Sequence, residues 1–347
     1  MKKLKYLAIF ILPLTVWVSF SSVGILCYLP HFVFFGLLPL LELIIPHNTS
    51  TNDQSETILA KKDMFYDTLL FFLLPVQWGF VFYFLFHISS VNDFSDLIGQ
   101  ITSLGFMCGI IGINVGHELG HRSNRFEQFI GELLLLSSLE NHFLPYHNSG
   151  HHANVCTFSD PATARKNEPI YWFIFRSHFG SYVQAWQFEL KRMLIIKKNK
   201  LSLRNKMIQY SLVQLILVLS IFWFFGGLVL FYFLLASITG IILLELVNYI
   251  EHYGLLRHQR ENGTFETFKN CHAWNSNHIG GRVILFELSR HSDHHMKPDK
   301  PYHVLECKTE CPLMPTGYPG MVLLALIPPL FFWIMNPKVE AVLKKDF

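Results

Sequence analysis

The chain has 347 residues, of which 51% are hydrophobic and only 15% are charged, and its formal net charge is +3. A mean hydropathy of +0.32 is far too high for a soluble protein with an ordinary surface. The composition therefore excludes an ordinary soluble globular protein and indicates a protein that sits in a membrane.

Apolar runs long enough to cross a bilayer recur along the chain. A helix needs about 20 apolar residues to cross about 30 Å of hydrocarbon. The runs predict helices near 5–21, 24–45, 64–86, 96–116, 207–226 and 228–250. A further stretch, 321–335, is short for a span and contains two prolines, so we expect it to lie along the interface or on the bundle. The predicted fold is all-α: an integral membrane bundle of about six spans that forms a single domain over 1–347.

The distribution of Lys and Arg predicts the orientation. These residues accumulate in cytoplasmic loops. With the N-terminus inside, the outer segments are 22–23, 87–95 and 226–227, and all 28 basic residues fall on the inner side. The regions 117–206 and 251–347 are then cytoplasmic and form a helical cap on the bundle.

Histidine is the second anomaly of the composition. Eighteen imidazoles bring no packing advantage to a membrane bundle, because each needs a polar partner. His117 and His121 lie where the fourth span ends, and if the helix continues, their spacing of four residues points both rings the same way. Alone, this H-E-x-x-H motif is the zinc-protease signature, in which Glu118 is the general base.

Further histidines follow with ligand-like spacing. Two more clusters occupy 147–152 and 291–295, and His252 lies at the cytoplasmic end of the sixth span. The nine candidate ligands are His117, His121, His147, His151, His152, His252, His291, His294 and His295. A single zinc takes four ligands, so nine imidazoles fit two metals better. Imidazole alone does not choose among zinc, copper, iron and nickel.

The sequence also bears on thiols and electron supply. The six cysteines are scattered, and we expect Cys307 and Cys311, the only close pair, to be ordinary reduced thiols. The chain has no C-x-x-C pair, haem motif or G-x-G-x-x-G, so electrons must come from another protein. Two interpretations of the basic run 191–206 remain: it steers an acidic electron donor, or it fixes topology and contacts anionic lipid.

Taken together, the motifs resemble those of the bacterial membrane alkane hydroxylases, which are non-haem di-iron alkane 1-monooxygenases. More distantly they resemble xylene monooxygenases and fatty acid desaturases. The motifs are HELGHR, HNSGHH followed by SDPATAR, NYIEHYG, HAWNSNH, SRHSDHH and PTGYPGMVLLALIPP. The H-x-x-x-H-H spacing and the NYIEHYG element favour a hydroxylase over a desaturase. Tyr146, Ala273 and Asn277 depart from the family pattern, and these changes alter the site if their positions orient ligands.

The resemblance implies that the nine histidines bind two Fe ions. It implies insertion of one atom of O2 into the terminal C–H of a medium-chain n-alkane, which gives a 1-alkanol. It further implies electrons from rubredoxin and its NADH-dependent reductase, a bacterial inner membrane with the N-terminus and metal site cytoplasmic, contact with membrane lipids and no nucleic-acid partner. Residues expected to support the ligands are Glu118, Glu251, His272, Asn275 and Asp293.

Other interpretations stay open on the sequence alone. One is a desaturase or hydroxylase of fatty acyl chains, or a hydroxylase of methyl-aromatics. Another is an intramembrane zinc protease with Glu118 as its base. The last is a metal-handling or transport protein without catalysis. Metal analysis and product analysis separate these alternatives.

Overall fold

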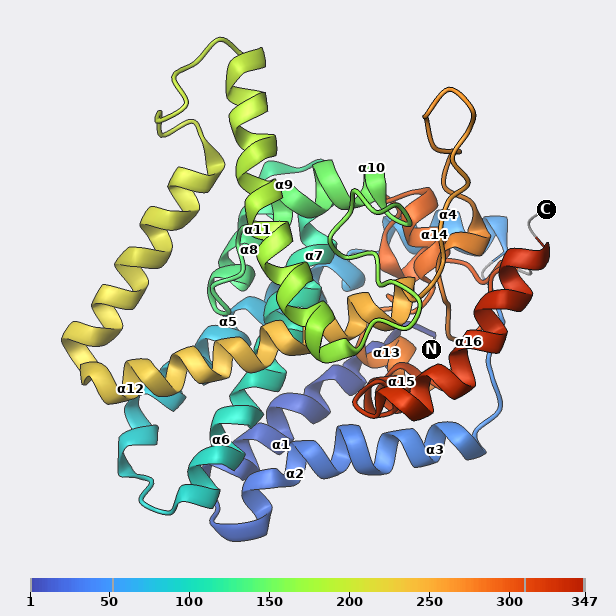
Figure 1. Ribbon diagram of the computed structural model, residues 1–347. Helices are drawn as coiled ribbons and strands as arrows, with labels where there is room; N and C mark the ends of the chain where they lie inside the picture. Colours follow the sequence, from blue (N-terminus) through green and yellow to red (C-terminus); the bar gives the residue numbers. More distant parts are fainter. Residues whose placement is uncertain (1, 52, 309, 346–347) are drawn as a thin grey trace. The chain divides into compact units, whose positions relative to one another are not determined.

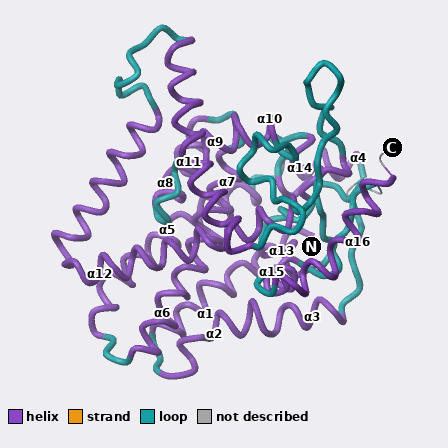
Figure 2. Tube along the Cα trace, in the orientation of Figure 1, coloured by secondary structure: helices purple, strands orange, loops and turns teal. Residues whose placement is uncertain are grey.

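The computed structural model describes residues 2–51, 53–308 and 310–345. These residues form helices and loops, with no strand among them (Figure 2). Within the same residues, extended pairing is limited to two isolated bridges, Gln259 with Phe265 and Asn275 with Leu313. The predicted all-α fold is confirmed.

Five helices are long and apolar enough to cross a membrane. They are Lys2–Phe20, Gly24–Ile44, Phe65–Ser90, Phe94–Gly120 and Lys206–His252. The last has 47 residues, and its backbone leaves helical geometry at Gly226, where φ is 85° and ψ is 168°. Glycine adopts this backbone without a Cβ clash. The break falls between the two spans that the sequence predicts for this region.

The chain divides into two compact units. The first contains 1–36, 64–146 and 183–244, and the second contains 37–63, 147–182 and 245–347. Two long helices, α11 (Ile170–Ile195) and α12 (Lys206–His252), begin in one unit and end in the other.

The first unit is built from apolar helices. Its elements are a 3-10 helix (Lys2–Phe10), α1 (Ile11–Phe20), a 3-10 helix (Gly24–Tyr28), α2 (Leu29–His31), a wide helical turn (Phe32–Leu37) that ends at the start of the second unit, α5 (Phe65–His87), a 3-10 turn (Ile88–Ser90), α6 (Phe94–Met107), a wide helical segment (Cys108–Ile113), α7 (Asn114–Gly120), α8 (Arg125–Leu136) and α9 (Phe143–Tyr146). Helices α1, α5 and α6 pack against one another (Figure 1). Side chains of Asp93 and Asn124 cap the first turns of α6 and α8, accepting backbone N–H groups that would otherwise lack partners.

A close approach between α7 and α8 places the first histidine box. A Cβ built on Gly131 would lie 2.9 Å from the carbonyl oxygen of Gly116, so the two backbones touch where neither residue has a side chain. Small residues permit this kind of helix contact in membranes. Ile113, Leu135 and Phe143 form a buried cluster beside the contact.

The second unit carries the remaining short helices. They are α3 (Leu38–Ile44), α4 (Gln54–Lys62), a wide turn (His147–His151), α10 (His152–Asn154), a 3-10 turn (Asn270–His272), α13 (Ile279–Ile284), α14 (His291–Met296), a 3-10 turn (Tyr302–Val304), α15 (Tyr318–Ala325) and α16 (Pro328–Lys345). The apolar stretch 321–335 is split between α15 and α16, and it is not among the five helices that could span a membrane.

Candidate metal centre

The first histidine box lies at the C-terminal end of α7. His117 is inside the helix and His121 directly follows its last residue. One turn separates the two rings, so they lie on the same side, with their Nε2 atoms 3.0 Å apart. Gly120, between them in sequence, packs closely against Leu144, whose Cδ2 a Cβ at this position would overlap. The H-E-x-x-H spacing gives two convergent imidazoles, as predicted.

The second box folds as a helical turn that is wider than an α-helix. In this pattern the backbone hydrogen bonds join residues five apart, which brings residues five apart onto one face. The Nε2 atoms of His147 and His152 are accordingly 3.0 Å apart. His151 points elsewhere, with its Nδ1 3.0 Å from Oδ2 of Asp160. With the extra residue in H-x-x-x-H-H, the rings of His147 and His152 point toward each other and the ring of His151 points elsewhere.

The third box occupies α14, a helix of only six residues. Such a helix is too short to be stable alone and depends on tertiary contacts. The side-chain carbonyl of Asn275 accepts the N–H of Ser292 at 3.0 Å, and its amide donates to the Ser292 hydroxyl at 2.6 Å. The carboxylate of Asp293 binds Lys300 Nζ at 2.6 Å. These contacts hold the helix that presents the three C-terminal histidines.

Four of the candidate ligands form one buried group within the second unit. His151, His252, His291 and His295 each offer one nitrogen, and these nitrogens lie within 4.8 Å of one another. All four side chains are at most 7% exposed. Three sequence segments supply them, so the group exists only in the folded chain.

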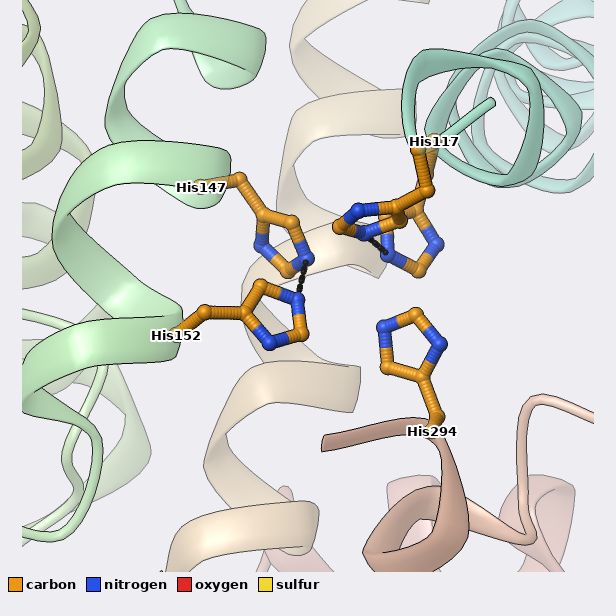
Figure 3. Close-up of side chains that lie close together, drawn as sticks. His117, His147, His152 and His294 are labelled. Atoms are coloured by element: carbon orange, nitrogen blue, oxygen red, sulfur yellow. Dashed lines mark hydrogen bonds between the residues drawn. The ribbon is translucent and has the colours of Figure 1, made fainter. Parts of the chain in front are cut away.

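A second group in the same unit has the same spacing. The ligand nitrogens of His147, His152 and His294 lie within 4.8 Å of one another, and Figure 3 shows these three rings turned toward a common space. His147 comes from the wide turn, His152 from α10 and His294 from α14. Seven of the nine predicted ligands are therefore gathered in two groups within one unit.

The spacing and chemistry of these nitrogens fit a metal ion. A zinc–imidazole bond is about 2.0–2.1 Å long, so two ligands at right-angled or tetrahedral positions have nitrogens about 2.8–3.4 Å apart. His291 Nε2 lies 3.1 Å from that of His252 and 2.9 Å from that of His295. Neighbouring rings are thus placed like adjacent ligands of one ion, and an all-imidazole set suits zinc, copper, iron or nickel.

Burial keeps these rings in the metal-binding form. Burial, helped by the neighbouring His151, lowers the pKa of His294 to about 3. Burial and the surrounding histidines hold the pKa of His295 well below its ordinary value. A neutral imidazole offers a lone pair to a metal, whereas a protonated one does not. At neutral pH His294 and His295 are therefore ready to bind a metal ion.

Two buried carboxylates lie behind the ligand rings. Asp160 faces His151 and also accepts the hydroxyl of Thr163 at 2.8 Å. Glu251 has its Oε1 atom 3.2 Å from His291 Nδ1. A carboxylate on the outer nitrogen of a ligand fixes the tautomer and orientation of the ring and increases its basicity.

The residues predicted to support the ligands have different surroundings. Glu251 and Asn275 contact the ligand-bearing segments directly, as described above. Glu118 is paired with Arg122 at 2.9 Å. The Nε2 atom of His272 lies 3.3 Å from Glu266 Oε1.

Sequence reasoning missed two residues beside the ligands. Asp160 lies in SDPATAR and Tyr318 in PTGYPG, two motifs that contribute to the resemblance without an assigned role. An acidic residue shortly after a histidine box was a usable signal for Asp160. Nothing local connects Tyr318 with His252, because 65 residues of chain lie between them.

The positions that depart from the family pattern are all buried. Tyr146 is 1% exposed and directly precedes His147. Ala273 is fully buried, and its carbonyl accepts the Asn275 amide at 2.8 Å. Asn277 donates to the sulfur of Cys307 at 3.1 Å. All six cysteines, including Cys307, are free thiols.

Comparison with known proteins identifies the family. Residues 97–308 match the model of the fatty acid desaturase family. The chain is 35% identical over 309 residues to alkane 1-monooxygenase 1 of Alcanivorax borkumensis, covering 88% of this chain and 76% of the relative. It is 36% identical to alkane 1-monooxygenase 2 of the same organism, covering 98% of this chain and 92% of the relative.

A more distant relative is named for a different substrate. The xylene/toluene monooxygenase hydroxylase component of Pseudomonas putida is 28% identical over 88% of this chain and 81% of the relative. In the stronger matches, most of this chain aligns with most of the relative. The convergent histidines lie within or close to the matched region. The chain therefore belongs to the alkane 1-monooxygenase branch of the fatty acid desaturase family and is a membrane oxidoreductase with a histidine-bound metal cofactor.

Proposed function

We propose that this protein is a non-haem di-iron monooxygenase that converts a medium-chain n-alkane to its 1-alkanol. One atom of O2 enters the terminal C–H bond, and the other leaves as water after two electrons and two protons have been supplied. Rubredoxin, reduced by an NADH-dependent reductase, is the proposed electron source. The observation that carries the proposal is the pair of imidazole groups, in a chain whose relatives are named alkane 1-monooxygenases.

We propose that nine histidines hold the two irons. His151, His252, His291 and His295 supply four nitrogens for one ion. His147, His152 and His294 supply three for the other. His117 and His121, held 3.0 Å apart, are by themselves too few to form a metal site. We propose that they bind the second ion together with the three-histidine group, which gives nine histidine ligands in all.

The protein's own residues prepare the site for this chemistry. Bound iron would supply the O2 activation that no amino-acid side chain provides. The chain contributes buried neutral imidazoles, and Asp160 and Glu251 orient two of them from behind. Burial also excludes water from the ligand nitrogens.

We further propose a single membrane domain in the bacterial inner membrane, with the N-terminus and the metal centre cytoplasmic. The break at Gly226 supports counting α12 as two spans, which restores the predicted six. The absence of Lys and Arg from the predicted outer segments supports the orientation. A hydrocarbon substrate would then reach the site from the bilayer.

Two measurements on the purified membrane protein test the proposal. Metal analysis is expected to find two iron atoms per chain, and His252→Ala is expected to lose iron, whereas His258→Ala, at an exposed position outside both groups, is not. With rubredoxin, its reductase, NADH and ¹⁸O2, octane is expected to yield 1-octanol carrying one ¹⁸O atom. One zinc per chain, or no oxygenated product from any alkane, would reject the proposal.

A methyl-aromatic substrate is the second candidate, because the Pseudomonas putida relative is a xylene/toluene monooxygenase component. Benzylic alcohol formed faster than any 1-alkanol would favour this candidate. The zinc-protease interpretation is disfavoured, because the carboxylate needed as the base, Glu118, is paired with Arg122.

A further inference from the structure

The PTGYPG segment contributes to the family resemblance, but the proposed chemistry gives it no role. Tyr318, the first residue of α15, is only 1% exposed. Its hydroxyl donates to Oε1 of Glu251 at 2.8 Å. Glu251 is itself 2% exposed and directly precedes the candidate ligand His252. A carboxylate buried this deeply requires hydrogen-bond donors, and Tyr318 supplies one.

The same carboxylate oxygen also faces the metal-binding group. Oε1 of Glu251 lies 3.2 Å from Nδ1 of His291. The opposite edge of that ring points into the group, where its Nε2 is 3.1 Å from that of His252 and 2.9 Å from that of His295. A neutral imidazole that binds metal through Nε2 carries its hydrogen on Nδ1. The carboxylate therefore faces the nitrogen that carries that hydrogen.

Tyr318 is fixed in this position from its N-terminal side. The carboxylate of Glu42, on α3, accepts the N–H of Gly281 at 2.6 Å. A Cβ built on Gly317 would overlap the other oxygen of Glu42, so the backbone directly before Tyr318 lies against this carboxylate. Burial and Glu251 also raise the pKa of Tyr318 well above its ordinary value, so its hydroxyl keeps the proton that it donates.

We propose that Tyr318 is a positioning residue for the metal centre: its hydroxyl fixes the Glu251 carboxylate, which in turn holds His291 with Nε2 directed at the metal. The inference rests on the proposed function in one respect, namely that His291 is a metal ligand. Removing a carboxylate that supports a metal-bound histidine commonly lowers the metal affinity about 10–100-fold. Tyr318 extends this support by one further hydrogen bond.

The test uses the purified, metal-loaded protein and measures metal release rather than turnover. Wild type, Tyr318→Phe, Glu251→Gln and the double variant are challenged with excess chelator, and the metal remaining on the protein is followed over time by mass spectrometry. The matched control is Tyr249→Phe, which removes another buried hydroxyl, one that donates to the carbonyl of Glu168 at 2.7 Å. The melting temperature of each variant reports general loss of stability.

We expect Tyr318→Phe to release metal about 10-fold faster than wild type. Tyr249→Phe is expected to release metal like wild type, while both tyrosine variants lose similar stability. The double variant should release metal no faster than Glu251→Gln, because the two residues act through one contact. Equal release by Tyr318→Phe and Tyr249→Phe would overturn the inference. If the wild type holds no metal, the proposed function fails instead, so the two failures are distinguishable.

Discussion

Asp160 and His151 form a contact that is almost completely shielded from solvent. Oδ2 of Asp160 lies 3.0 Å from Nδ1 of His151, and each residue is 1% exposed. The eight residues between them in sequence include the end of the second histidine box and the start of SDPATAR. The contact joins two motifs that appear separate in the sequence, and it leaves Nε2 of His151 as the nitrogen that could bind a metal ion.

Replacing Asp160 by Asn is expected to weaken metal binding about 10–100-fold, because the amide no longer stabilises the required tautomer with a negative charge. The measurement is the metal content after equilibration with a graded series of chelator concentrations. Asp299→Asn, at an exposed aspartate in the same unit, is the control and should match wild type. Identical curves for both variants would show that Asp160 does not act on the metal.

The contact between α7 and α8 leads to a second prediction. In Gly131→Ala the new methyl group meets the backbone of Gly116 at 2.9 Å, and a backbone does not yield as a side-chain end would. We expect a loss of about 1–3 kcal/mol, seen as a lower melting temperature in detergent. Gly79→Ala is the control, because a Cβ there has no neighbour within 4 Å. Equal melting temperatures for the two variants would show that the helices separate at no cost.

The sequence predicted best those features that depend on the spacing of residues within one helix. Apolar runs located the spans, and the four-residue spacing of His117 and His121 predicted their convergence, because both properties belong to a single helix. The wide turn at 147–151 was not predictable in the same way. It decides which of His151 and His152 joins which group, and it depends on how the turn packs rather than on spacing alone.

Long-range contacts were beyond local pattern altogether. Glu42 and Gly317 meet although 274 residues separate them in the chain. Glycine before an aromatic residue and glutamate at the end of an apolar run are each ordinary features. Only the folded chain shows that the Glu42 carboxylate lies against the backbone at Gly317.

Removing the metal is expected to destabilise the protein. A ligand that binds only the folded state adds stability in proportion to RT ln(1 + [L]/Kd), so its removal lowers the melting temperature. Without an ion, the Nε2 atoms of the buried His252 and His291 rings face each other at 3.1 Å. Melting curves before and after chelation, and after restoring iron, provide the measurement. An unchanged melting temperature would mean that the imidazole groups hold no structural metal.

Stability should also fall in mildly acidic solution because of a histidine outside both metal groups. Burial, together with the neighbouring His47, lowers the pKa of His278 to about 4. Its Nδ1 is 2.9 Å from the hydroxyl of Ser276. Between pH 6.5 and 4 the unfolded chain binds a proton at this position that the folded chain does not, so stability is lost as the pH falls through that window.

The expected loss from His278 is about 1–3 kcal/mol across the window. His278→Gln should make the melting temperature of metal-free protein less dependent on pH between 6.5 and 4. His258→Gln, at an exposed position, should leave the dependence unchanged. Equal slopes for wild type and His278→Gln would exclude this residue as the cause.

The basic segment before α12 could steer an electron donor or contact anionic lipid, and its exposed side chains favour lipid. Lys197, Lys198 and Lys200 are exposed, and so are the neighbouring Leu201 and Leu203, at 80% and 66%. Apolar side chains among lysines at the start of a membrane-spanning helix are typical of a segment that contacts anionic lipid headgroups. A docking site for a soluble acidic protein has no need of exposed leucines.

We therefore expect the triple change of these lysines to Gln to reduce bound phosphatidylglycerol, counted by native mass spectrometry, at least twofold. The KM for the electron donor and its salt dependence should stay unchanged. Lys61→Gln with Lys62→Gln, at exposed positions in the last turn of α4, is the matched control and should retain the lipid. A several-fold rise in the donor KM with unchanged lipid binding would instead assign the segment to steering of the electron donor.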